Sequence, residues 1–309
     1  MPETCNSCGN RLIPHMSEVR DPLTGETFDV AKCIKCGLGH TLPQPGDMGH
    51  YYAEPYYGNR HGFTLRHCIR RRLRFIAAAL PERPGRRLLD IGCGDGSFLM
   101  AARDAGWDVM GTELNPQPAR AAGLDVREGI EQITSSDQFD CVTMWHTLEH
   151  MRDIPSMLAN IARMIRPEGR LIIAVPDSSG LQALIFRERW LHADVPRHLY
   201  HFDDGSLQHC LNAAGFSIER RWHQEFEYDL LGWSQSALNR LMPRHPNLFM
   251  DTVTGKGGEG GNLIRGGAFL LGSLLTLLSL PLLLLGTLMG RGGSLVVVAK
   301  HGEGTGHFR

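Results

Sequence analysis

One stretch, residues 87–106 with the sequence RLLDIGCGDGSFLMAARDAG, constrains the fold of this chain most. An apolar run at Arg87–Ile91 predicts a strand, three glycines at alternate positions follow, and a helical pattern begins at about Ser97. Glycines let the backbone bend sharply and let a ligand lie against main-chain amides. The order of strand, glycine turn and helix is therefore typical of nucleotide-binding α/β proteins.

Two carboxylates accompany this turn. Asp90 lies at its start, and Glu113 ends the next predicted strand, WDVMGTELN, 23 residues later. A carboxylate at the second position can accept both hydroxyls of a ribose. A dinucleotide site has similar glycines, but a pyrophosphate is disfavoured beside Asp90, whereas a cationic nucleoside without phosphate is favoured. S-adenosylmethionine fits that description.

The alternation of strands and helices continues along the chain. A strand is predicted at Phe139–Trp145, a helix at about Ile154–Ile165, a turn at RPEG and a strand at Arg170–Val175. A helix and a sixth strand follow before residue 223. This pattern predicts parallel βαβ units.

With these motifs the chain resembles the class I S-adenosylmethionine-dependent methyltransferases, in the branch similar to ubiquinone-biosynthesis O-methyltransferases and to bacterial methyltransferases with an N-terminal zinc ribbon. The resemblance covers about residues 85–223 and the last strand, GSLVVVAKH. It implies an α/β fold with a Rossmann-like, seven-stranded methyltransferase sheet. It also implies that the cofactor is bound by Asp90, Gly92, Gly94, Gly96, Glu113, Glu128 and Trp145.

The segment HTLEH, residues 146–150, has the HxxEH spacing of inverted zinc peptidases. On a helix, His146 and His150 would lie one turn apart and could hold a metal while Glu149 activates water. Here the segment follows the predicted fourth strand, where open α/β sheets hold their ligands. The resemblance implies that it belongs to the cofactor pocket, and a zinc metallopeptidase stays the alternative.

The segment RERWLHADVPRHLYHF, residues 187–202, has neither helical nor strand periodicity. Such a segment is often a binding loop. A hydroxyl acceptor must lose its proton during methyl transfer, and histidine titrates near neutral pH. The candidate bases are His146, His192 and His198, and the candidate substrate-binding residues are Trp190, Arg197 and Tyr200.

Four of the eight cysteines form two CxxCG motifs, CNSCG and CIKCG. Each motif lets two thiolates reach one ion, and four thiolates leave no open position, which is typical of a structural zinc. The predicted metal ligands are Cys5, Cys8, Cys33 and Cys36, and Gly9 and Gly37 permit the tight turns. A redox pair, free thiols and a site that no longer holds metal are the alternatives.

The formal net charge of −1 gives no global field for a polyanion, so no nucleic-acid partner is expected. The N-terminal residues show no secretory signal, which favours a cytosolic protein. The arginine-rich residues Thr64–Leu80 predict a basic amphipathic helix. That helix either packs on the next domain or attracts anionic lipid or a phosphorylated substrate.

Residues 268–290 contain no charge over 23 positions, enough for about 34 Å of helix. One crossing would separate the last strand from its sheet, and Pro281 is expected to break the run into a shallow membrane hairpin. Packing against protein is the alternative. Contact with a membrane surface would give access to a lipid-linked acceptor.

The predicted organisation is a zinc ribbon at 1–45, a linker and basic helix at 46–84, a methyltransferase core at 85–223 and 294–301, and an insertion at 224–293. The predicted function is methyl transfer from S-adenosylmethionine to a small or lipid-linked acceptor, with a hydroxyl favoured, on the cytosolic face of a membrane. A zinc-ribbon adaptor that binds cofactor without turnover is a further alternative.

Overall fold

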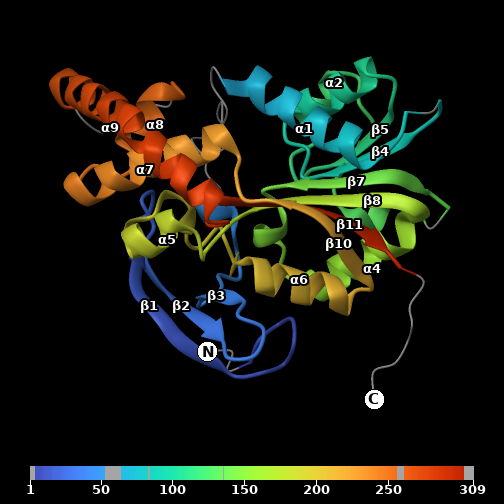
Figure 1. Cartoon of the computed structure of the whole chain (residues 1–309), viewed down its shortest axis with the longest axis horizontal. Coiled ribbons are helices and arrows are strands. Elements are labelled where there is room, and N and C mark those ends of the chain that lie inside the picture. The colour runs from blue at the N-terminus through green and yellow to red at the C-terminus, as the bar shows by residue number, and fades with distance from the viewer. Residues whose placement is uncertain (1–3, 53–63, 83, 135, 256–260, 303–309) are drawn as a thin grey trace. The chain divides into compact units, whose positions relative to one another are not determined.

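The computed structural model describes residues 4–52, 64–82, 84–134, 136–255 and 261–302. The chain forms two compact units (Figure 1). The methyltransferase unit comprises residues 66–175, 207–221 and 296–309, and the ribbon unit comprises residues 1–65, 176–206 and 222–295. Part of the predicted linker, residues 53–63, lies outside the described residues.

The methyltransferase unit is built on a seven-stranded sheet with the order β10-β11-β8-β7-β4-β5-β6, which confirms the predicted fold class. The strands β4, β5, β6, β7 and β8 pair in parallel. Their bounds are β4 Arg87–Ile91, β5 Asp108–Thr112, β6 Val126–Arg127, β7 Phe139–Trp145, β8 Ile165–Pro176, β10 Phe216–Trp222 and β11 Ser294–His301. The predicted RPEG turn is wrong, because residues 166–169 lie within β8 where its register with β7 shifts.

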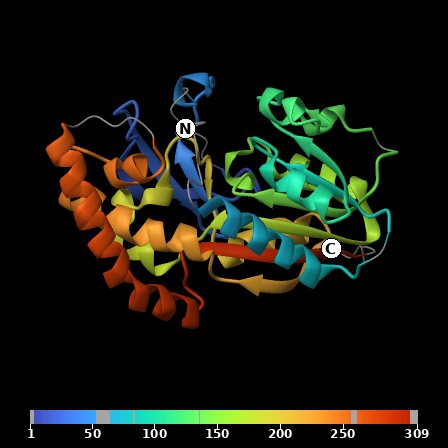
Figure 2. The ribbon, with the colours of Figure 1, turned by 90° about the horizontal axis from the view of Figure 1, so that it is seen from above.

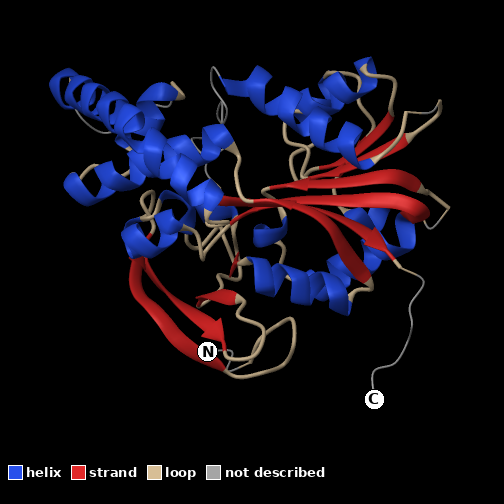
Figure 3. Cartoon of the chain, viewed as in Figure 1, coloured by secondary structure: helices blue, strands red, loops and turns tan. Residues whose placement is uncertain are grey.

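Helices cover both faces of this sheet (Figures 1 and 3). The helices are α1 Leu65–Ala79, α2 Ser97–Asp104, α3 Gln117–Ala121, α4 Ile154–Met164 and α6 Asp204–Ala213. Because both faces are covered, the central strands are rich in apolar residues, and all of β7 is buried, including Asp140 and Thr143. The predicted basic helix is confirmed as α1; Arg72 is buried, and Arg66, Arg70 and Arg74 are exposed at intervals of four residues.

The ribbon unit begins with a four-stranded sheet in the order β1-β2-β3-β9. Its strands are β1 Leu12–Arg20, β2 Thr27–Cys33, β3 Gly39–Leu42 and β9 Tyr200–His201, so the segment predicted as a binding loop supplies the last strand. The helices of this unit are α5 Leu181–Phe186, α7 Phe226–Leu241, α8 Leu248–Val253 and α9 Asn262–Leu288, with the short turns η1 Gly49–Tyr51, η5 Arg187–Arg189 and η6 Leu191–Ala193.

One hydrophobic core joins these parts of the ribbon unit. It contains Val30 of β2, Phe186 of α5, Trp190, Trp233 of α7 and Leu283 of α9, among others. The cysteine-bearing ribbon is therefore not an independent domain, because its sheet shares a hydrophobic core with the helices of the insertion.

The predicted membrane hairpin is wrong in its geometry, because α9 is one continuous helix with Pro281 inside it (Figure 2). Pro281 removes one backbone donor, but buried residues occur on both sides of it, at Gly272 and at Leu283 and Gly286. Gly272 is packed so closely that an added Cβ would lie 2.4 Å from the Phe249 ring. Packing against α7 and α8 keeps the helix continuous through the proline.

A buried arginine holds three segments of the ribbon unit together. The guanidinium of Arg197 donates to Asp21 Oδ1 at 2.7 Å, to Asp194 Oδ1 at 2.8 Å and to the carbonyl oxygen of Tyr51 at 3.3 Å. Its side chain is only 1% exposed, and that of Asp21 is fully buried. This arrangement favours a structural role for Arg197 over the predicted role as a substrate anchor.

We expect Arg197→Gln to lower the free energy of unfolding by about 3–5 kcal/mol, because it leaves Asp21 as an uncompensated buried charge. Urea denaturation followed by near-UV circular dichroism measures this change. The matched control is Arg189→Gln in the same segment, which we expect to change stability by less than about 0.5 kcal/mol. Equal stability of both variants would contradict the structural role.

Candidate functional site

The candidate site of the methyltransferase unit lies where three neighbouring strands end. β4 has β5 on one side and β7 on the other, and Asp90 is aligned with Gly111 and with Thr143. The carboxyl ends of β4, β5 and β7 therefore meet at one edge of the sheet. Open α/β sheets bind their ligands at such an edge.

The glycine turn after β4 has the backbone shape that its sequence predicts. Gly92, Gly94 and Gly96 have φ values of +77°, +59° and +79°. A Cβ on Gly92 would lie 2.6 Å from the side chain of Thr147, whereas a Cβ on Gly94 would meet no atom within 4 Å. Gly94 thus presents its bare backbone to open space, where a ligand could lie against it.

Glu113 is fixed by this turn. Its Oε2 accepts a hydrogen bond from the Gly94 amide at 2.9 Å, and its Oε1 accepts one from the Leu114 amide at 2.9 Å. A carboxylate has about four lone-pair positions. Glu113 can therefore still accept two hydrogen bonds from neighbouring hydroxyls.

Asp90 lies buried beneath the turn, and burial raises its pKa to about 7. Thr143 Oγ1 donates to Asp90 Oδ1 at 2.6 Å, and this bond and the charge of Arg72 act in the opposite direction. The pKa of the neighbouring Cys93 thiol is also raised, first by burial and then by Asp90, Glu113 and Asp95. The potential in this turn is negative and favours a cation.

Trp145 ends β7 and is 5% exposed. Its indole Nε1 is buried and has no hydrogen-bond partner among the described residues. The guanidinium of Arg72 lies 5.0 Å from the centre of the indole ring, and the Phe98 ring makes an edge contact at 5.7 Å. A buried indole N–H without an acceptor is rare, and a ligand acceptor would satisfy it.

Glu128 follows the short strand β6. Its carboxylate is largely exposed and lies 3.8 Å from the guanidinium of Arg120. β6 itself is aligned with the end of β5, where Gly111 pairs with Val126. Glu128 is thus one strand further along the same edge as Glu113.

The HTLEH segment is not helical, which removes the basis of the peptidase alternative. His146 has φ +52° directly after β7, and only Leu148–His150 form a single 3-10 turn. His146 Nδ1 lies 3.7 Å from the buried carboxylate of Glu149. Among the described residues, no group of possible metal ligands contains both His146 and His150.

The other candidate histidines belong to the ribbon unit. His198 Nδ1 lies 2.9 Å from the carbonyl oxygen of His192 and must donate to it, and His198 Nε2 lies 3.9 Å from Asp194 Oδ2. His192 Nε2 lies 3.4 Å from the carbonyl oxygen of Tyr228. In the neutral form of His198 the hydrogen is therefore on Nδ1 and the lone pair on Nε2.

The predicted substrate residues Trp190 and Tyr200 are both buried. The indole Nε1 of Trp190 donates to Gln182 Oε1 at 3.3 Å. The ring of Tyr200 makes an edge contact with His40, with ring centres 5.1 Å apart. Trp190 also lines a cavity of the ribbon unit, so it is the better placed of the two for contact with a ligand.

The four predicted metal ligands lie together. The Sγ atoms of Cys5 and Cys36, of Cys8 and Cys33, and of Cys8 and Cys36 are 3.6, 3.5 and 3.6 Å apart. A disulfide needs about 2.05 Å, whereas sulfurs at the corners of a zinc tetrahedron are about 3.8 Å apart. Gly9 and Gly37 have positive φ, as their place after each CxxC predicts. The cysteines could therefore hold one tetrahedral metal ion.

Comparisons with known proteins agree with this fold. A family model described as "Methyltransferase domain" matches residues 60–220, more than half of the 309-residue chain. The ubiquinone biosynthesis O-methyltransferase of Aeromonas salmonicida is 37% identical over 102 residues, which cover 29% of this chain and 43% of that protein. The 27-O-demethylrifamycin SV methyltransferase of Amycolatopsis mediterranei is 32% identical over 176 residues, covering 46% and 64%.

The chain thus spans about half the length of the first two curated relatives that it matches, 43% and 47%. Among solved structures, the phospholethanolamine N-methyltransferase 2 of Haemonchus contortus superimposes with a TM-score of 0.54 at 15% identity. That structure is a complex with phosphomonomethylethanolamine and S-adenosylhomocysteine. That superposition covers 86% of this chain and 62% of the other. At this identity the likeness concerns the fold alone.

The sheet order and the glycine turn with its two carboxylates define a class I, S-adenosylmethionine-dependent methyltransferase. The chain belongs to the methyltransferase-domain family.

Proposed function

We propose that this protein transfers the methyl group of S-adenosylmethionine to a small or lipid-linked acceptor. The observation that carries the proposal is the pair of carboxylates at the glycine turn, with Glu113 bound to the Gly94 amide and Asp90 buried beneath it. The residues that would hold the cofactor are Asp90, Gly92, Gly94, Gly96, Glu113, Glu128 and Trp145.

These residues have complementary tasks in the proposal. Glu113 would accept the ribose hydroxyls, Trp145 would offer its unpartnered indole N–H, and Asp90 would stabilise positive charge. When bound, S-adenosylmethionine supplies a sulfonium whose methyl group is open to in-line attack. The chain itself would then chiefly position the acceptor.

A hydroxyl acceptor would also need a base. Of the three candidates, His198 is favoured, because its Nδ1 is fixed on His192 O and Asp194 can stabilise the imidazolium that forms. Arg197 then acts as a positioning residue, since it binds the same carboxylate of Asp194. His146 and His192 stay candidates for orienting the acceptor.

The cysteine cluster is proposed to hold a structural zinc. Four thiolates complete the tetrahedral coordination of the ion and leave no position for substrate. Because the ribbon sheet shares a core with Trp190 and α7, metal binding would stabilise the segment that carries His198.

The helix α9 is proposed to lie in a membrane surface. It is long and apolar enough to cross a bilayer, but only 22% of its most apolar window is buried in the protein. Leu270, Leu277 and Leu284, seven residues apart, are 72%, 66% and 59% exposed. The opposite face packs on α7 and α8, which favours a helix lying in the interface over one that spans.

Hydrogen bonds after the C-terminal end of α9 also favour a helix that lies in the membrane surface. Leu181 N donates to Arg291 O at 3.0 Å and Asp177 N to Gly293 O at 3.0 Å. The buried Asp229 accepts from Gly293 N and Ser294 Oγ at 3.1 and 2.8 Å. These bonds hold the chain after α9 to the protein, so that β11 stays in its sheet.

Calorimetric titration with S-adenosylmethionine tests the cofactor site. We expect Glu113→Gln to weaken binding about 10- to 100-fold, the loss expected for charge-assisted hydrogen bonds of about 1.5–3 kcal/mol. The matched control is Glu168→Gln in the same unit, whose side chain is 78% exposed. Absence of S-adenosylmethionine binding to the wild type would overturn the proposal.

A second experiment measures the transfer of labelled methyl groups to membrane extracts. Transfer indicates an enzyme, and cofactor binding without transfer indicates an inactive adaptor.

Metal analysis of the purified protein tests the zinc site. We expect one zinc per chain, lost in Cys33→Ser because three thiolates no longer close the tetrahedron. His146→Ala is the control and should keep the metal, since His146 is not part of the cysteine cluster. Loss of zinc from the histidine variant would revive the peptidase alternative.

Cosedimentation with lipid vesicles tests α9. Replacing Leu270, Leu277 and Leu284 together by Ser should weaken vesicle binding at least 100-fold, because each buried leucine contributes about 1.5–3 kcal/mol. The control replaces the exposed Leu23 and Ile34 of the ribbon and should bind as the wild type does. If the wild-type protein does not cosediment with vesicles, α9 does not bind a membrane surface.

A further inference from the structure

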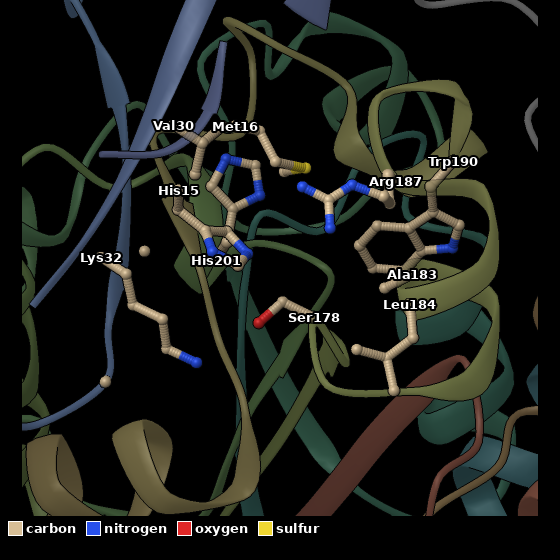
Figure 4. Close-up of a pocket in the computed structure, with 12 residues that line it drawn as sticks. His15, Met16, Val30, Lys32, Ser178, Ala183, Leu184, Arg187, Trp190 and His201 are labelled. Atoms are coloured by element: carbon tan, nitrogen blue, oxygen red, sulfur yellow. The ribbon is translucent and has the colours of Figure 1, made fainter. Parts of the chain in front are cut away.

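A small cavity lies within the ribbon unit, between its sheet and α5 (Figure 4). Its volume is about 50 Å³. One water needs about 10–15 Å³ on this scale, so the cavity accommodates a group of a few heavy atoms. Its polar lining comes from His15, Lys32, Ser178, Arg187 and His201.

This cavity, hereafter the cationic cavity, has no acidic residue in its lining. The ammonium group of Lys32 pairs with Asp203 at 3.0 Å. Arg187 and His15 make no side-chain hydrogen bond or ion pair with any part of the chain that the structure describes. The pKa of His15 is lowered by burial, and then by Lys32 and Arg187. Lys32 therefore has a counterion in Asp203, whereas Arg187 has no anionic partner among the described residues, and its charge together with that of Lys32 favours the neutral form of His15.

The backbone directs Arg187 into this position. Arg187 follows α5 with φ +48° and ψ −119°, a conformation that residues with a side chain rarely adopt. Figure 4 shows its guanidinium extending toward His15 and Met16. A costly backbone conformation that aims a charged group into a cavity is a mark of a binding function.

Both sides of the cavity also carry apolar residues. Ala183 and Leu184 of α5 lie on one side with Arg187 and Trp190, and Met16 and Val30 of the ribbon sheet lie beside His15 on the other. A ligand that fits this mixed lining would combine an anionic group with an apolar one.

The arrangement of the hydrogen-bond donors favours a tetrahedral oxyanion. The cations Lys32 and Arg187 and the imidazole of His15 come from three separate elements, and the Ser178 hydroxyl adds a further donor. A phosphate group has three oxygens for such donors, and arginine binds phosphate with its planar fork. A carboxylate offers only two oxygens, which lie in one plane, and would therefore accept hydrogen bonds from fewer of these donors.

We propose that the cationic cavity binds the phosphate group of an amphiphilic ligand. The ligand is a phosphate ester whose apolar part carries a free hydroxyl, and we assign it as the methyl acceptor, an assignment that rests on the proposed function. The hydroxyl oxygen would form the bond to the methyl group as the bond from sulfur to methyl breaks, its proton would pass to the base, and S-adenosylhomocysteine would leave. The predicted substrate residue Trp190 then contacts the apolar part.

Titration calorimetry with phenyl phosphate tests the cavity. The wild type should bind phenyl phosphate more tightly than inorganic phosphate and should not bind benzyl alcohol. Arg187→Gln should weaken phenyl phosphate binding about 10- to 100-fold, because it removes a charge-assisted contact. Arg189→Gln is the matched control, since Arg189 does not line the cavity, and should bind as the wild type does.

A second variant separates binding from folding. Arg187→Gly removes the side chain and suits the positive φ, so it should be at least as thermostable as the wild type and bind phenyl phosphate as weakly as Arg187→Gln. S-adenosylmethionine binding should be unchanged in both variants. Equal phosphate affinity of the wild type and both variants would overturn the proposal, whatever the cofactor titration shows.

A third comparison identifies the source of the phosphate. Dihexanoyl phosphatidic acid, used below its micellar concentration, is compared with phenyl phosphate. Tighter binding of the lipid supports a lipid-linked ligand, and tighter binding of phenyl phosphate supports a soluble one. If neither binds more tightly than inorganic phosphate, the apolar half of the proposal is wrong.

Discussion

The position of β4 between β5 and β7 is the constraint on which the methyltransferase unit depends. Parallel strands bring their carboxyl ends to one edge, and this order brings Asp90, Glu113 and Trp145 there from three separate segments. The same order buries Asp90, and burial raises the pKa of its carboxyl, so that a bound cation would favour its ionised form. Topology thus produces the electrostatics of the site.

Much of this site could be predicted because its signals are local. The strand, the glycines and the helix lie within 20 residues, and Glu113 ends the adjacent strand. The HTLEH segment shows why a short motif alone does not predict a metal site. Its two histidines lie on one face only if the segment is helical. The segment instead leaves β7 through a residue with positive φ, so the strand before it decides its conformation.

The features that the sequence does not reveal have non-local causes. Pro281 predicts a break, yet packing of α9 on both sides of the proline preserves the helix. The carboxylate partner of Arg197, Asp21, lies 176 residues away in the sequence, and no sequence pattern indicates the pairing. The lining of the cationic cavity likewise comes from separate elements, β1, β2, β9 and α5. The contact between Arg72 and Trp145 is also non-local, and the sequence of α1 does not show which of its arginines makes it.

The glycine turn and the cationic cavity carry opposite local charge, and this difference has consequences for the proposed reaction. The glycine turn concentrates carboxylates, whereas the cationic cavity concentrates basic groups. A phosphate-bearing acceptor, as proposed, would be repelled by the first and attracted by the second, and a sulfonium would show the reverse preference. Charge would thus direct each ligand to its own site. Methyl transfer removes the positive charge of the sulfonium, so Asp90 and Glu113 would bind the spent cofactor less strongly than the fresh one. The buried carboxylate that favours binding of the cofactor would therefore also favour its exchange after each turnover.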